Sequence, residues 1–173
     1  MIERGAFAEL HCLSNYSFLR GASHPEELVY KASDLGYSAI AITDECSYSG
    51  LVKAHVAAKQ CGIKLIVGAE FFVDMTHGEE KNSVENIIML APTRQAYGQL
   101  SAFISKIRRK NQKGNSYLGY EDCQIGLSDC LILWSPELQD IDIQVSVGHK
   151  LKTIFQHFWI TLELFQDGFD IDK

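Results

Sequence analysis

Hydrophobic residues occur in short runs along most of this chain, and six of the runs predict β-strands. Some runs are almost continuously apolar and others alternate with polar residues, so at least one face of each strand would be buried. The six predicted strands are 6–14, 37–43, 63–73, 86–91, 130–134 and 158–165.

Between these runs, apolar residues recur at the spacing of a helix. Pro25 suits the first turn of a helix, and Glu26 and Glu27 lie where the positive end of its dipole favours acids. Gly36 and Gly62 end the first two helices. Strands that alternate with helices predict parallel α/β units. The helical segments are 25–35, 50–61, 94–109 and 149–157, with a short helical piece in 120–127.

Three stretches show neither the apolar spacing of a helix nor the alternation of a strand. Residues 74–85 predict a loop or hairpin tip, 111–120 a loop rich in Gly, Asn and Ser, and 135–148 an irregular acidic segment. Six strands are too few for a closed eight-stranded barrel, which needs about 250 residues. A last parallel strand without a following helix would leave one face open. We therefore expect a domain that is incomplete at its C-terminus.

Composition narrows the class of protein. The net charge of −6 argues against a chain that is a nucleic-acid-binding surface as a whole, and the basic cluster 106–110 falls at a helix end, where the dipole favours cations. No apolar run is long enough to span a membrane, and the N-terminus lacks a signal peptide's apolar core. Five scattered cysteines without paired spacing indicate reduced thiols. We expect a cytoplasmic protein without a membrane partner.

Polar side chains follow three of the predicted strands. They are His11, the pair Asp44 and Glu45, and Glu70. Neighbouring parallel strands lie about 4.8 Å apart, so these groups can converge at one end of the sheet. One imidazole with carboxylates can bind Zn, Mn or Fe. Alternatively, the acids cap a turn or face solvent, and His11 is a hydrogen-bonded core histidine.

Three stretches carry a family resemblance. They are ELHCLSNYSFLRGASHPEELV, LGYSAIAITDECSYSG and GIKLIVGAEF. Together they resemble the N-terminal polymerase-and-histidinol-phosphatase (PHP) domain of bacterial C-family DNA polymerases, and the error-prone branch most closely. The later stretches IIMLAPTRQAYGQLS, DCLILW and FWITLELF follow in the family's order. The resemblance implies an α/β fold, a (β/α) barrel-like PHP domain over residues 1–173.

The same resemblance implies that the family's metal site is degenerate here. His11, Asp44 and Glu70 stand at ligand positions, but Leu13, Glu45 and Asn86 replace three histidines and Arg20 replaces an acid. Leucine cannot bind a metal, and arginine carries a permanent positive charge.

This ligand set does not support a trinuclear hydrolytic centre, so we expect no catalytic residue and no cofactor in this chain. Two arrangements stay open. One is an ion-pair network of Arg20 with Glu45 or Glu70. The other is a single weakly bound divalent ion (Mn, Zn or Mg) on His11, Glu70 and either Asp44 or Glu45.

By resemblance, the parent protein is an error-prone, DNA-directed DNA polymerase, a nucleotidyltransferase of DNA repair and replication across lesions. The polymerase palm and later domains are absent from this chain, so it would not polymerise by itself. We expect a mainly structural module that contacts the remaining polymerase domains and meets DNA only through the parent protein. The alternatives are a metal-dependent phosphoesterase or 3′–5′ exonuclease, and a protein-binding platform for a repair or clamp partner.

Overall fold

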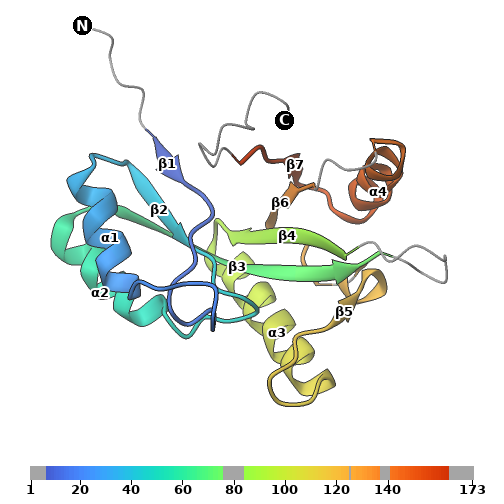
Figure 1. Ribbon diagram of the computed structural model, residues 1–173, viewed down its shortest axis with the longest axis horizontal. Helices are drawn as coiled ribbons and strands as arrows, with labels where there is room; N and C mark the ends of the chain where they lie inside the picture. Colours follow the sequence, from blue (N-terminus) through green and yellow to red (C-terminus); the bar gives the residue numbers. More distant parts are fainter. Residues whose placement is uncertain (1–6, 76–83, 125, 137–140, 164–173) are drawn as a thin grey trace, which may run out of the picture.

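The computed structural model describes residues 7–75, 84–124, 126–136 and 141–163, which form one curled seven-stranded sheet with helices on its outer side (Figure 1). The main path of the sheet has the order β1-β2-β3-β4-β6-β7, and β5 pairs with β3. The strands are β1 (Ala8–Glu9), β2 (Ala39–Ile42), β3 (Lys64–Asp74), β4 (Val84–Ala91), β5 (Leu118–Gly119), β6 (Leu131–Ser135) and β7 (Phe158–Ile160). The helices are α1 (Pro25–Asp34), α2 (Leu51–Cys61), α3 (Arg94–Lys110) and α4 (Ile141–Ile154), with the 3-10 helix η1 (Tyr120–Gln124).

The direction of each strand depends on the segment that connects it to the strand before it. The first three strands pair in parallel, as the alternation with α1 and α2 predicts. Strand β4 is the next element after β3 among the described residues, and these two strands pair antiparallel. Most of the predicted hairpin tip between them, residues 76–83, lies outside the described residues. Strand β6 is antiparallel to β4 and parallel to β7.

The predicted first strand is too long. Only Ala8–Glu9 pairs with β2, because the chain then bonds to side chains. The N–H of Cys12 donates to Thr43 Oγ1 (3.0 Å), and the N–H of Ser14 donates to Asp44 Oδ1 (2.8 Å). These contacts satisfy the N–H groups of Cys12 and Ser14, while the carbonyl oxygen of Cys12 accepts a hydrogen bond from the N–H of Thr43 at 2.9 Å.

The last helix and the last strand also differ in position from their predicted ranges. Helix α4 begins at Ile141, inside the stretch predicted to be irregular, and ends at Ile154. Val147 and Leu151 form its buried stripe at i and i+4. The last strand ends at Ile160, and residues 164–165 of its predicted range are outside the described part. Strand β5, in the predicted loop 111–120, was not expected.

The core lies on both faces of the sheet. Ile87 and Ile88 are consecutive and both fully buried, so the middle of β4 is covered from two sides. On the outer side, β3, β4 and β6 pack against α3 and α4. A second cluster joins α1 and α2 to β2. A small apolar cluster forms on the inner side from Ala41, Ile88, Leu90 and Leu133.

Alternation along β3 decides which residues face inward. Phe71 and Val73 belong to the outer core, so Glu70 and Phe72 point to the inner side of the curled sheet. None of the helices in the described ranges is a candidate membrane span. The five cysteines are free thiols.

Candidate functional site

Asp44 anchors the loop that follows β1. Its buried carboxylate accepts three hydrogen bonds: from the N–H of Ser14 (2.8 Å), from Ser14 Oγ (2.7 Å) and from Ser17 Oγ (2.8 Å). Ser17 Oγ also accepts from the N–H of Glu45 (3.0 Å). The hydrogen bonds of the Asp44 carboxylate therefore hold the loop, whereas His11 contacts Glu70.

Gly21 lets the loop close on itself. A Cβ atom at this position would lie 1.9 Å from the carbonyl oxygen of Ser14, a backbone atom that cannot rotate away. The N–H of Gly21 donates to the carbonyl oxygen of Ser17 (2.9 Å). The close approach of two backbone segments requires glycine here.

We expect Gly21→Ala to lower the free energy of unfolding by about 2 kcal/mol, because the clash forces the backbone to shift. The matched control is Gly98→Ala within α3, where an added Cβ meets no atom within 4 Å. That change should stabilise the protein by about 0.5–1 kcal/mol through helix propensity. Urea denaturation of both variants measures the two effects, and equal effects would contradict this account of Gly21.

Glu70 is the centre of an ion-pair network. Its side chain is fully buried, and both of its oxygens face the Arg20 guanidinium: Nη1 pairs with Oε1, and Nη2 lies 3.2 Å from Oε2. Asn86 Nδ2 donates to Oε2 at 3.2 Å. Burial alone would raise the pKa of Glu70, but the hydrogen bonds and charges of His11 and Arg20 outweigh it and hold the pKa below its usual range.

His11 bridges two carboxylates. Its Nε2 lies 2.9 Å from Glu70 Oε2, and its Nδ1 lies 2.5 Å from Glu163 Oε1. Burial alone would lower the pKa of His11, but the hydrogen bonds and charges of Glu163 and Glu70 outweigh it and raise the pKa to about 9. His11 is therefore positively charged at neutral pH. It connects the segment after β1 to the segment after β7, at opposite edges of the sheet.

Glu45 lies at the outer end of this network. Its Oε2 is 3.5 Å from Arg20 Nη1, and its Oε1 accepts from Ser116 Oγ at 2.7 Å. The carbonyl oxygens of Glu45 and Cys46 each accept a hydrogen bond from Arg108 at 3.0 Å. The end of α3 thus holds the turn that carries Glu45.

The basic end of α3 is used within the protein. Besides the bonds of Arg108, Lys110 Nζ lies 2.5 Å from Asp122 Oδ2, and Lys106 Nζ lies 3.6 Å from Asp122 Oδ1. Three members of the cluster 106–110 therefore have intramolecular partners. These contacts agree with the predicted position of the cluster at the end of a helix, where the dipole favours cations.

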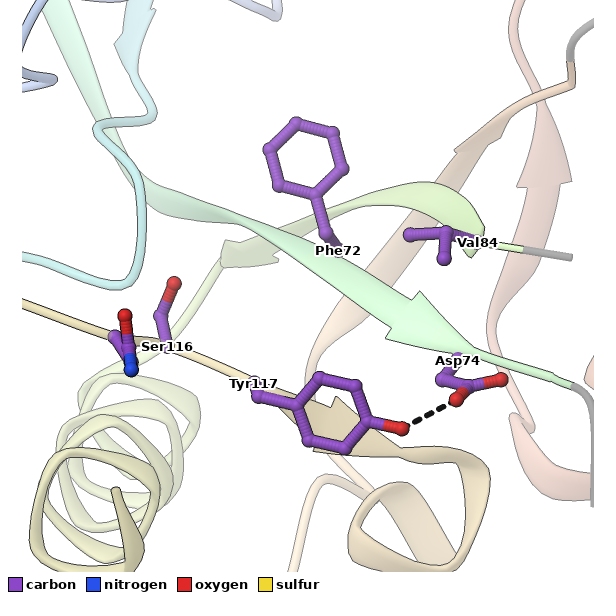
Figure 2. Close-up of a pocket in the computed structure, with 6 residues that line it drawn as sticks. Phe72, Asp74, Val84, Ser116 and Tyr117 are labelled. Atoms are coloured by element: carbon purple, nitrogen blue, oxygen red, sulfur yellow. Dashed lines mark hydrogen bonds between the residues drawn. The ribbon is translucent and has the colours of Figure 1, made fainter. Parts of the chain in front are cut away.

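A shallow pocket of about 490 Å³ lies beside the network (Figure 2). Arg20 connects the pocket to the ion-pair network, because its Cζ atom lies 4.8 Å from the centre of the Phe72 ring. The Tyr117 hydroxyl points to Asp74 and donates a hydrogen bond to it. The pocket is lined by Phe72, Asp74, Val84, Asn115, Ser116 and Tyr117.

Residues 9–152 match the PHP domain family. This match covers most of the chain and agrees with the curled α/β sheet. The chain belongs to the PHP domain family. The resemblance stated from the sequence motifs and the predicted fold class are thereby confirmed.

The PHP domain described here is homologous to the N-terminal region of error-prone DNA polymerases. It is 47% identical over 158 residues to the error-prone DNA polymerase of Idiomarina loihiensis, which covers 91% of this chain and 14% of that protein. It is 46% identical over 154 residues to the error-prone DNA polymerase of Saccharophagus degradans, covering 89% of this chain and 14% of that protein. The chain therefore spans about one seventh of the length of these relatives.

Solved structures of low sequence identity share the fold of this PHP domain. An amidohydrolase from Chromobacterium violaceum has a TM-score of 0.63 and 16% identity over 88% of this chain and 76% of that chain. A two-domain protein from Bacteroides vulgatus, which contains a predicted PHP-like metal-dependent phosphoesterase, has a TM-score of 0.54 and 16% identity. It covers 87% of this chain and 43% of that chain.

The structure brings together only part of the predicted set. His11 and Glu70 are in contact, and Glu45 joins them through Arg20. Asn86 contacts Glu70, whereas Leu13 is half-buried in the loop. Across the described ranges, no group of three or more His, Cys, Asp or Glu side chains is arranged to hold a metal ion. The ion-pair network considered from the sequence is present, with Arg20 pairing to both acids.

Sequence reasoning missed the partners that complete the network. Glu163 comes from the far edge of the sheet, and Ser116 comes from the segment before β5. Ser14 and Ser17 hold Asp44. Both lie in the first stretch that resembles the PHP family, but nothing in the sequence marked them as partners of Asp44. Each of these contacts depends on tertiary placement rather than on local spacing.

Proposed function

We propose that this chain is the PHP module of an error-prone DNA polymerase and that it serves the polymerase structurally, without hydrolytic activity. Homology to error-prone DNA polymerases along nine tenths of the chain supports the first part. The position of the Arg20 guanidinium against both oxygens of buried Glu70 carries the second part.

The donor set does not fit a hydrolytic metal centre. A divalent ion at Glu70 would have to displace the guanidinium or bind next to its permanent charge, and both are unfavourable. Both ring nitrogens of His11 already face carboxylates, and Asp44 is committed to Ser14 and Ser17. Arg20 and His11 supply beside Glu70 the positive charge that cations would otherwise supply.

Polymerase chemistry then belongs to the longer protein. We propose that its other domains bind DNA and transfer nucleotides across lesions during repair, in the cytoplasm. The PHP module contacts those domains and meets DNA only through them. The sequence identifies no nucleic-acid-binding residue in this chain, and Lys106, Arg108 and Lys110 at the end of α3 have partners within it.

Metal analysis tests the structural role. We expect the purified chain to retain no stoichiometric Mn or Zn after dialysis, and to show no hydrolysis of bis-p-nitrophenyl phosphate with either ion. The positive control is the triple variant L13H/R20E/N86H, which restores ligand types and removes the guanidinium. It should bind Mn measurably by calorimetry. Stoichiometric metal on the unaltered chain, lost in His11→Ala and accompanied by hydrolysis, would favour the phosphoesterase or exonuclease alternative instead.

A further inference from the structure

Two large apolar side chains project from the loop after β1. Phe18 is 84% exposed and Leu19 is 89% exposed, and we call these two residues the tip. Leu19 has a φ of 62°, in the left-handed region that a leucine rarely adopts. Such strain persists only where the surrounding structure enforces it, and it is typical of functional positions.

The residues on either side hold the tip in place. Ser17 precedes it and donates to buried Asp44, and Arg20 follows it and pairs with Glu70 and Glu45. The N–H of Arg20 also donates to the carbonyl oxygen of Ser17 at 3.0 Å, which closes a tight turn around the tip. Because Arg20 is held inward, the two residues before it are displayed outward on a fixed backbone.

The same loop also contacts helix α2. Tyr16 lies with its ring centre 6.0 Å from Lys53 Nζ, at the start of α2. Lys53 lines a shallow groove between α1 and α2, in which Val52 and Val56 are also exposed. Isolated exposed apolar residues are ordinary, but two adjacent large ones on a backbone held by hydrogen bonds and ion pairs mark an interaction surface.

We propose that the tip is the contact by which this module docks on the remaining part of the polymerase polypeptide, in an apolar depression that receives Phe18 and Leu19. The proposal rests on the proposed function. The chain spans 14% of the length of its curated relatives, so most of such a polypeptide lies outside the module.

The size of the tip favours a partner in the same polypeptide over a second copy of the chain. A stable dimer between separate molecules buries about 800 Å² on each partner, more than two side chains supply. A covalently linked domain has a high effective concentration, so a small anchor is sufficient to hold it. In this arrangement Arg20 is a positioning residue, because its ion pairs fix the direction of the tip.

Photo-crosslinking in the full-length polymerase tests the proposal. Benzoylphenylalanine at position 18 should cross-link to a peptide of the same polypeptide beyond the region homologous to this chain. The matched control places it at position 141 on α4, where Ile141 is 74% exposed. The control should give no such product. A cross-link from position 18 only to a second copy, or none in an active polymerase, would overturn the proposal.

A second measurement covers the case in which the probe disturbs the loop. The double variant F18S/L19S should leave the free energy of unfolding of the 173-residue chain unchanged, because both side chains are exposed there. In the full-length polymerase it should speed proteolysis between the module and the rest by about tenfold, the loss typical of one interface anchor. Unchanged proteolysis would refute docking. Stoichiometric metal or hydrolysis would instead refute the structural role, independently of these results.

Discussion

Arg20→Leu is expected to lower the free energy of unfolding by about 4 kcal/mol, because it leaves the Glu70 carboxylate buried without its main counter-charge. His11 and Asn86 still contact Glu70, but neither replaces a guanidinium that faces both oxygens. The variant should also raise the pKa of Glu70, so that part of the loss is recovered at acidic pH. Urea denaturation at pH 7 and at pH 5 measures both effects.

Two variants make the Arg20 result specific. The double variant Arg20→Leu/Glu70→Leu removes the stranded charge together with its partner and should recover most of the stability. Lys53→Leu removes a different ion pair, the 3.7 Å contact with Glu26 at the surface. It should cost less than about 1 kcal/mol, as exposed pairs do. If Arg20→Leu costs no more than Lys53→Leu, the network does not stabilise the fold.

The chain is expected to lose about 3 kcal/mol of stability between pH 6 and pH 9 through His11 alone. The pKa of this side chain is about 9 in the folded protein, above its ordinary value of 6.5. A raised pKa in the folded state means that stabilisation is fully present below pH 6.5. It is lost as the pH rises through 9, when the imidazolium that bridges Glu70 and Glu163 gives up its proton.

The slope of stability against pH, not its absolute value, is the test of His11. Burial raises the pKa of the Cys12, Cys46 and Cys130 thiols to about 11, so these groups add to the loss only near and above pH 9. Subtracting the profile of His11→Gln removes their contribution. Glu163→Gln should reduce the slope without abolishing it, because Glu70 remains. Identical slopes for His11→Gln and the unaltered chain would show that His11 does not titrate as argued.

Most elements of the fold could be predicted from local pattern. The runs that became β2, β3 and β4 are buried in the middle of a sheet and have little polar interruption, so their type was clear. The predicted first strand is longer than the observed one. Apolar content does not reveal that the N–H groups of Cys12 and Ser14 bond to side chains. The sequence pattern predicts a late start for helix α4 because the exposed apolar residues Ile141 and Val145 in its first turns obscure the inward stripe of Ile143 and Val147.

The sequence predicted most residues of the ion-pair network, but not which of them are in contact. Replacement of ligand types at Leu13, Arg20 and Asn86 could be inferred only from the family resemblance. That resemblance could not show that Arg20 reaches both Glu45 and Glu70, or that Asp44 turns to Ser14. Glu163 carried no signal, because nothing in a strand's alternation identifies a partner at the other edge of the sheet.

The contact between His11 and Glu163 also bears on the order in which the molecule folds. It joins residues 152 positions apart, while the ladders of β1 with β2 and of β6 with β7 form between nearer segments. Closing so long a chain segment is entropically costly until the intervening strands have paired. We therefore expect the curl of the sheet to close late, after the folding nucleus has formed. Weakening this contact would then accelerate unfolding while leaving the folding rate nearly unchanged.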